Sequence, residues 1–324
     1  MPLLDMPLDE LKKYSGRNPR PHDFDVFWNK ALKEMRDTDP NVLIEPATFT
    51  TPFADCFDLW FTGVRGARIH SRFLRPKKIE KPIPAVLQFH GYTGDCGDWS
   101  SKLAYVAAGF AVAAMDCRGQ GGLSEDVGGI KGNTFSGHFI RGIDDDPDNM
   151  LMRHIFLDTA QLAAIVMAMP EIDENRIAAM GGSQGGALTI ACASLEPRIN
   201  RLAPFYPFLC DYQRVWEMDL AKDAYEELTT YFRQFDPLHI REKEIFTKLG
   251  YIDLQHLSRW IKGKTIMATG LMDTICPPST QFAMYNKITS EKQLVLYPDF
   301  GHEGLPGFDD AIFTFMLGML GSEA

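Results

Sequence analysis

Residues 181–186 read Gly-Gly-Ser-Gln-Gly-Gly, and they directly follow an apolar run that ends at Met180. Glycine is unfavourable in strands and helices, so four glycines around one serine indicate a sharp turn or a close approach to the backbone. The pattern is G-x-S-x-G, and an apolar helix-forming stretch follows it. A strand, a tight turn and a helix in this order are typical of a strained turn that presents a nucleophile. The sequence therefore predicts that Ser183 is a nucleophile.

Apolar runs alternate with helical stretches on both sides of this turn, from residue 84 onward. The expected strands cover residues 85–89, 111–115, 176–180, 202–206, 265–269 and 293–297. The expected helices lie around residues 102–108, 157–169, 184 onward, 281–288 and 309–320. Such alternation indicates an α/β protein with a mainly parallel sheet and helices on both faces.

Two segments fall outside this alternation. Residues 21–76 contain an amphipathic helix within 21–37 and two strand-like runs, 57–62 and 67–75, which we expect to pair antiparallel. Residues 210–259 are helix-prone, aromatic and charged, which predicts a helical insertion. We interpret it as packing on the body through its aromatic side chains, with a lid or a subunit contact as the alternatives. Residues 1–324 are expected to form one domain.

The composition argues against several classes of function. The net charge is −10 and no basic stretch is present, so nucleic acid is not expected as a partner. The six cysteines show no zinc-binding spacing, and nucleotide-binding motifs are missing, so neither a metal nor a cofactor is expected. The N-terminus lacks the features of a signal peptide, and no apolar run is long enough to cross a bilayer. We therefore expect a cytoplasmic protein without a membrane partner.

A serine nucleophile needs a base, and the base needs a carboxylate that orients it. In chains with this turn the order is serine, acid, histidine, and the two partners follow later strands. Asp273 follows the strand expected at 265–269, and His302 follows the strand expected at 293–297. The other histidines precede the serine or lie in the expected insertion. Asp299 is the alternative acid, but it is close to the base in sequence and awkwardly placed to orient it.

The reaction also needs two N–H donors for the oxyanion of the intermediate. One is expected from Gln184, directly after the serine, and the other from the loop after the strand at 85–89. That loop begins His90-Gly91-Tyr92, which makes the backbone N–H of Tyr92 the second candidate. The ring of Tyr92 is expected to form a wall of the acyl site, and His90 to pack and hydrogen-bond within its loop.

Together these features resemble carbohydrate esterase family 7, the acetyl xylan esterases and cephalosporin C deacetylases. The resemblance spans essentially the full length and includes the N-terminal Pro-Leu-Asp-Glu-Leu segment and the Phe27-Trp28 helix. Its motifs are Arg118-Gly119-Gln120, the G-x-S-x-G turn, Asp273 and His302-Glu303. The resemblance implies the α/β-hydrolase fold and a catalytic triad of Ser183, Asp273 and His302. It also implies an oxyanion hole from Tyr92 and Gln184, with Arg118 and Gln120 bracing the site.

The same resemblance implies the removal of acetyl groups from small acetylated carbohydrates, such as xylo-oligosaccharides, and from cephalosporin C. It further implies a cytoplasmic homo-oligomer, typically a hexamer. The main alternative is a broad short-chain carboxylesterase, which only the acyl-length profile separates from a deacetylase. A peptidase of the prolyl oligopeptidase type usually carries a large β-propeller domain, for which this chain has no room. A binding scaffold of the same fold would normally lack part of the triad.

Overall fold

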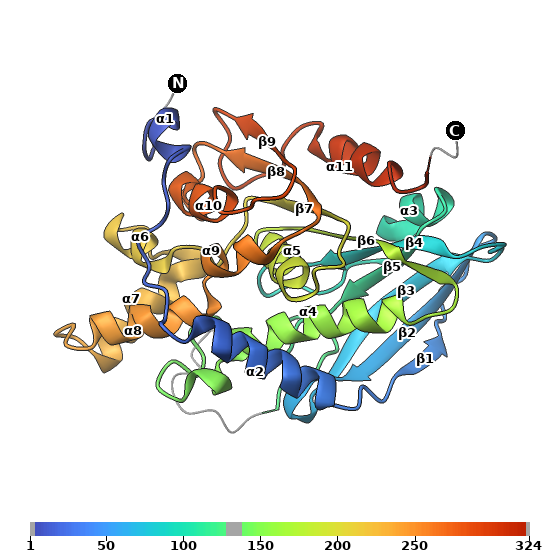
Figure 1. The fold of residues 1–324 in the computed structure, drawn as a ribbon, viewed down its shortest axis with the longest axis horizontal. Helices are drawn as coiled ribbons and strands as arrows, with labels where there is room; N and C mark the ends of the chain where they lie inside the picture. Colours follow the sequence, from blue (N-terminus) through green and yellow to red (C-terminus); the bar gives the residue numbers. More distant parts are fainter. Residues whose placement is uncertain (1–3, 128–137, 322–324) are drawn as a thin grey trace.

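A nine-stranded sheet forms the centre of the computed structural model, which describes residues 4–127 and 138–321 (Figure 1). The strands lie in the order β1-β2-β3-β5-β4-β6-β7-β8-β9. Their bounds are β1 Leu43–Pro46, β2 Ala54–Thr62, β3 Arg68–Pro76, β4 Ile83–Phe89, β5 Ala111–Met115, β6 Ile172–Gly182, β7 Arg201–Phe205, β8 Lys264–Gly270 and β9 Lys292–Tyr297. All strands from β5 to β9 in this order run parallel to one another, as the alternating sequence predicts.

The first three strands form the antiparallel side of the sheet. The expected pairing of the two early runs is confirmed, with Phe57 of β2 opposite Phe73 of β3, and β3 then pairs antiparallel with β5. The edge strand β1 was not predicted. Its four residues are all exposed, so the alternation of buried and exposed positions that marks a half-buried strand is missing there.

Side chains from both faces of the parallel strands are buried. Leu87 of β4 belongs to one apolar cluster, and its neighbour Val86 belongs to a second cluster on the opposite face. Ala113 and Val112 of β5 divide in the same way. Successive strand residues point to opposite faces, so a strand covered on both sides is a continuous apolar run.

Helices cover both faces of the sheet (Figure 1). Helices α4 and α5 pack on one face with α2 against α4, while α3 and α11 pack on the other. The helical bounds are α1 Leu8–Leu11, α2 Phe24–Asp37, α3 Leu103–Ala107, α4 Leu151–Met167, α5 Gln184–Leu195, α6 Tyr212–Glu217, α7 Glu226–Phe235, α8 Glu242–Leu249, α9 Leu254–Leu257, α10 Pro278–Tyr285 and α11 Phe308–Leu317. No helix in the described ranges is both long and apolar enough to cross a bilayer.

Several helix boundaries differ from the expected ones. Helix α4 begins at Leu151 rather than at 157. The sequence did not indicate its first turns, because they carry Arg153 and His154, polar residues that are nevertheless buried. Helix α10 begins at Pro278, a residue that favours the first turn of a helix, and it ends at Tyr285. Helix α11 ends at Leu317, directly before Gly318.

The expected insertion consists of α6 to α9 and the short turns between them. Most of its aromatic side chains pack as interpreted. Tyr225 and Phe232 are fully buried. The Tyr225 ring lies 4.5 Å from that of Phe208 between centroids, and the Trp216 ring lies tilted against that of Phe232 at 4.8 Å. Phe235 is the exception, with about half of its surface exposed.

Candidate active site

The candidate site residues follow the carboxyl ends of the parallel strands. Tyr92 comes after β4, Gln120 after β5, Ser183 after β6, Asp273 after β8 and His302 after β9. The carboxyl ends of parallel strands lie at one edge of the sheet, which is where open α/β sheets bind their ligands. The topology therefore brings together residues that are far apart in the sequence.

Ser183 lies in a strained backbone conformation at the end of β6. Its φ is 56° and its ψ is −120°, values that a serine rarely adopts. The strain is held by three backbone hydrogen bonds of 3.0 Å, in which the Ser183 N–H donates to Phe205 and the Ser183 carbonyl accepts from Ala187 and Phe208. The turn exposes part of the Ser183 side chain, whereas Gln184 is buried.

The glycines around Ser183 leave room for this turn. A Cβ atom on Gly182 would lie 2.1 Å from the Phe205 ring, and one on Gly185 would lie 2.1 Å from the Phe89 carbonyl oxygen. Both distances are far below van der Waals contact, so only glycine fits without a shift of the surroundings. The opening prediction of a sharp turn with close backbone neighbours is thereby confirmed.

Asp273 and His302 contact each other directly. His302 Nδ1 lies 2.9 Å from Asp273 Oδ2, and the Asp273 carboxylate is fully buried. The N–H groups of Ile275 and Cys276 donate to Asp273 Oδ1 at 2.9 and 2.8 Å, and Gln281 Nε2 donates to Oδ2 at 3.3 Å. Hydrogen bonds that N–H groups donate to a charged carboxylate fix its orientation. The carboxylate in turn orients the imidazole and leaves Nε2 of His302 as the free nitrogen.

No hydrogen bond joins the Ser183 hydroxyl to His302 within residues 4–127 and 138–321. Catalytic hydrogen bonds are often long in the absence of substrate and tighten in the complex. The alternative acid, Asp299, is exposed, and His302 pairs with Asp273 instead.

Tyr206 supports His302 from the side and was not predicted from the sequence. The two rings lie 4.4 Å apart between centroids, and Tyr206 directly follows β7 at the same sheet edge. Burial, aided by the nearby Asp273 carboxylate, raises the pKa of Tyr206 to about 12, so the phenol stays neutral beside the imidazole. Its position after a parallel strand is the one signal in the sequence that pointed to it.

A pair of glutamines joins the two segments that carry the expected oxyanion donors. Gln120 and Gln184 exchange two side-chain hydrogen bonds of 2.8 and 2.9 Å. Gln120 Oε1 also accepts the N–H of Thr93 at 2.9 Å, which ties the loop after β4 to the start of α5. The backbone N–H groups of Tyr92 and Gln184 have no hydrogen-bond partner within the described residues. The side chain of Gln120 thus contacts both the loop after β4 and the start of α5.

His90 and Arg118 act as structural supports. His90 Nδ1 donates to the Gly91 carbonyl at 2.7 Å within its own loop, as interpreted, while Nε2 accepts the N–H of Cys117 from the segment after β5 at 3.0 Å. Arg118 is fully buried and makes a bidentate pair of 2.5 and 2.7 Å with Asp158 of α4. Arg118 thus braces the loop after β5 against the helix layer.

Two groups of potential metal ligands occur among the described residues: Asp273 with Cys276 and His302, and His70 with Cys96 and Asp116. In the first, the Asp273 oxygens are occupied by hydrogen bonds, and burial raises the pKa of the Cys276 thiol far above its usual range. In the second, both ring nitrogens of His70 contact carboxylates, at 2.7 and 2.9 Å. Neither group presents free, deprotonated ligands for a metal ion.

Known proteins are similar to this chain in sequence and in fold. Residues 1–319 match the family model described as acetyl xylan esterase (AXE1). Acetyl xylan esterase 1 from Thermoanaerobacterium sp. JW/SL YS485 is 59% identical, with a TM-score of 0.97 and coverage of 98% of this chain and 100% of that one. The acetyl xylan esterase from Paenibacillus sp. R4 is 34% identical, with a TM-score of 0.92 and coverage of 96% and 99%.

A curated relative, the acetyl esterase Axe7A of Xylanibacter ruminicola, is 28% identical over 295 residues, or 89% of this chain. The chain spans 64% of that relative's length. The mainly parallel sheet and the strained serine between β6 and α5 are those of the α/β-hydrolase fold. With a family match over nearly its whole length, the chain belongs to the acetyl xylan esterase family.

Proposed function

We propose that this protein is a serine esterase that removes acetyl groups from small acetylated carbohydrates, including acetylated xylo-oligosaccharides, and from cephalosporin C. The observation that carries the proposal is the Asp273–His302 hydrogen bond at the sheet edge where the Ser183 turn lies. The names of the relatives, acetyl xylan esterases and an acetyl esterase, support the choice of the acetyl group. Cephalosporin C enters on the resemblance in motifs alone.

In the first half-reaction, the Ser183 oxygen attacks the acetyl carbonyl while Nε2 of His302 takes the hydroxyl proton. Asp273 stabilises the imidazolium that forms, through its bond to Nδ1. The N–H groups of Tyr92 and Gln184 bind the oxyanion, each lowering the barrier by about 3 kcal/mol. The carbon–oxygen bond to the sugar then breaks, and the sugar alcohol leaves with the proton from His302.

In the second half-reaction, water attacks the acetyl-serine and gives its proton to His302. Collapse of the intermediate releases acetate and returns the proton to Ser183. The half-buried ring of Tyr92 lies on the loop that carries one oxyanion donor, so we assign it as a wall of the acyl site. A bulky acyl chain would meet this wall, which favours acetate.

We also propose that the protein acts in the cytoplasm as a homo-oligomer, with the hexamer of the resembled family as the expected state. The edge strand β1 supports an assembly, because Leu43 and Ile44 are more than 40% exposed and an unpaired apolar edge is a template for pairing. Light scattering in solution tests this assignment. A mass about six times that of one chain is expected, and a monomer would contradict it.

The substrate proposal is tested by acetate release from acetylated xylo-oligosaccharides and cephalosporin C, beside acetyl, butyryl and octanoyl nitrophenyl esters. Release from both natural compounds and a steep fall in rate with acyl length are expected. Octanoate cleaved as fast as acetate would identify a broad carboxylesterase instead. Activity on xylo-oligosaccharides without activity on cephalosporin C would remove only that substrate from the proposal.

A further inference from the structure

The phenol of Tyr92 is held by a side chain from the helical insertion. Its hydroxyl donates to Glu227 Oε1 and accepts the N–H of His138 at 3.1 Å. Its ring packs against Phe208, with 5.2 Å between the centroids, and the Phe208 N–H donates to the carbonyl of Ser183. A tyrosine side chain has few rotatable bonds, so an anchor at its hydroxyl also restrains its backbone.

Glu227 lies at the start of α7 and is nearly buried, with 6% of its surface exposed. Besides the Tyr92 hydroxyl, its carboxylate accepts the N–H groups of His138 and Ile140, each at 3.2 Å. No lysine or arginine forms a salt bridge with Glu227 within residues 4–127 and 138–321. Burying a carboxylate without a cation costs free energy. The hydrogen bonds that offset this cost come from the Tyr92 hydroxyl and from the backbone N–H groups of residues 138–140.

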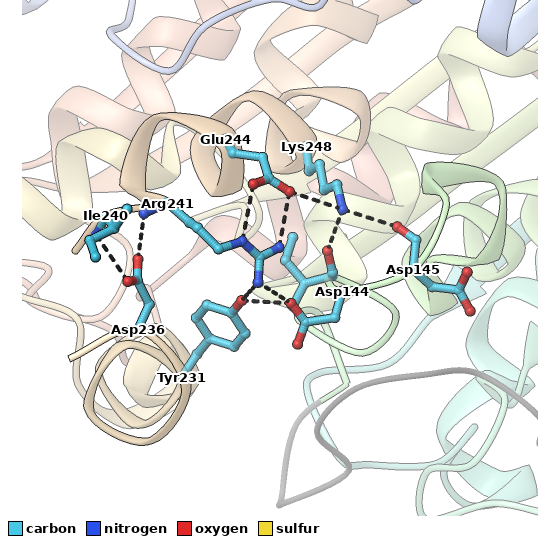
Figure 2. A network of polar contacts seen from close by, with 9 residues as sticks. Asp144, Asp145, Tyr231, Asp236, Ile240, Arg241, Glu244 and Lys248 are labelled. Atoms are coloured by element: carbon cyan, nitrogen blue, oxygen red, sulfur yellow. Dashed lines mark hydrogen bonds and ion pairs between the residues drawn. The ribbon is translucent and has the colours of Figure 1, made fainter. Parts of the chain in front are cut away.

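The insertion also binds residues 143–145, which follow the residues that Glu227 contacts. Figure 2 shows Arg241 between Asp144 and Glu244, with Tyr231 donating to the same Asp144 oxygen. The distances from Asp144 Oδ1 are 2.7 Å to the Tyr231 hydroxyl and 2.8 Å to the Arg241 guanidinium. Lys248 of α8 donates to the backbone carbonyls of residues 143 and 145. Helices α7 and α8 thus hold residues 138–145 at two separate points.

We propose that Glu227 is a positioning residue for the oxyanion hole and the acyl pocket. It holds the Tyr92 hydroxyl, so that the N–H of residue 92 points at the oxyanion and the ring closes the space beyond the acetyl methyl group. The proposal rests on the proposed function, in which that N–H is an oxyanion donor. It assigns the insertion a part in selecting short acyl groups, through a contact that does not touch the substrate.

The test compares Glu227→Gln, Tyr92→Phe and the double variant with wild type, on nitrophenyl acetate and nitrophenyl butyrate. Glu227→Gln keeps the shape but turns an acceptor into an amide donor, and Tyr92→Phe removes the hydroxyl while keeping the ring and the N–H. Each single change should lower kcat on acetate by about ten- to a hundredfold with little change in KM, because a displaced oxyanion donor acts in the transition state. Each should also raise the butyrate-to-acetate rate ratio.

The double variant should be no slower than the slower single variant, because both changes break the same contact. Glu226→Gln, the exposed neighbour, is the matched control and should behave as wild type. A Glu227→Gln protein with wild-type kcat and acyl ratio, or effects that multiply in the double variant, would overturn the proposal. If Glu227→Gln does not fold, a Tyr92→Phe enzyme with wild-type kcat and acyl ratio overturns it equally. A wild type inactive on acetyl esters would instead refute the proposed function.

Discussion

Ser183 shows how local packing and chemistry depend on each other. Its strained φ of 56° places the hydroxyl beyond the end of β6, and the helix that begins at Gln184 directs free N–H groups toward the same place. Gly182 and Gly185 are required because the turn runs against Phe205 and Phe89. The same geometry that leaves no space for a Cβ atom thus forms the site that we propose for the oxyanion.

Gly185→Ala should therefore destabilise the protein and reduce its activity. The new methyl group would lie 2.1 Å from the Phe89 carbonyl oxygen, and a backbone atom cannot move aside as a flexible side chain can. We expect unfolding by denaturant to show a loss of roughly 1–3 kcal/mol. Gly304→Ala is the control, since no atom lies within 4 Å of a Cβ there. Equal stability of the two variants would contradict this account.

Asp273→Asn should lower kcat on nitrophenyl acetate by about a thousandfold or more, because the amide no longer holds His302 in the required tautomer. KM should change little, as Asp273 is fully buried and the substrate does not reach it. Asp299→Asn, at the exposed alternative acid, should leave kcat at the wild-type value. The reverse result, a loss in Asp299→Asn alone, would assign the orienting role to Asp299.

Among single residues, the sequence predicted those that lie in a motif or directly after an expected strand. Ser183 lies in a recognisable turn, and Asp273 and His302 follow apolar strands in the expected order. Tyr206, Gln281 and Glu227 were missed because their roles come from contacts across the fold, such as the ring contact of Tyr206 with His302. No local pattern distinguishes such residues from ordinary buried polar side chains.

Among the elements, the loop after β5 and helix α4 are joined by the Arg118–Asp158 pair. Both side chains are almost completely buried, and Arg118 lies two residues before Gln120, whose side chain contacts Gln184. Burial raises the pKa of Asp158, while the guanidinium of Arg118 opposes that change. A buried pair of this kind is costly to break from one side, because the remaining charge has no partner.

Arg118→Met should thus lower the free energy of unfolding by about 3–5 kcal/mol, whereas Arg118→Met with Asp158→Leu should recover much of the loss. Denaturant unfolding curves provide the measurement. Arg198→Met, which removes an arginine about half exposed, is the control and should cost about 1 kcal/mol or less. An Arg118→Met protein as stable as Arg198→Met would show that the buried pair is not required for stability.

Element prediction succeeded where burial is regular. The strands at 111–115 and 202–206 match β5 and β7 within one residue, because strands covered on both faces are continuous apolar runs. It failed at β1, which is exposed, and at the first turns of α4, where Arg153 is buried by tertiary contacts with Glu34. In both places the surrounding structure, rather than the local pattern, decides the conformation.

In the molecule as a whole, the insertion is coupled to the sheet edge through Glu227. Burial raises the pKa of Glu227 from 4.5 to about 7, although its hydrogen-bond donors oppose this. Between pH 4.5 and about pH 7, the Glu227 carboxyl group keeps its proton in the folded protein and has released it in the unfolded chain. The resulting stability is complete below about pH 4.5 and is lost as the pH rises through about 7.

Wild type should therefore lose up to about 3 kcal/mol more unfolding free energy than Glu227→Gln between about pH 4.5 and pH 8. The glutamine cannot titrate, so its curve lacks this contribution. Guanidinium unfolding at several pH values measures the difference between the two proteins. Curves that run parallel over the whole range would mean that Glu227 titrates alike in the folded and unfolded chains.

Ser183 is the proposed nucleophile of an acetylesterase, and the Ser183→Ala enzyme is the decisive test of that role. Its rate on nitrophenyl acetate is measured beside wild type, with thermal unfolding to establish that the variant is folded. We expect a folded protein whose kcat falls by about a thousandfold or more, because no acetyl-serine can form. A folded Ser183→Ala enzyme with wild-type activity would show that Ser183 is not the nucleophile.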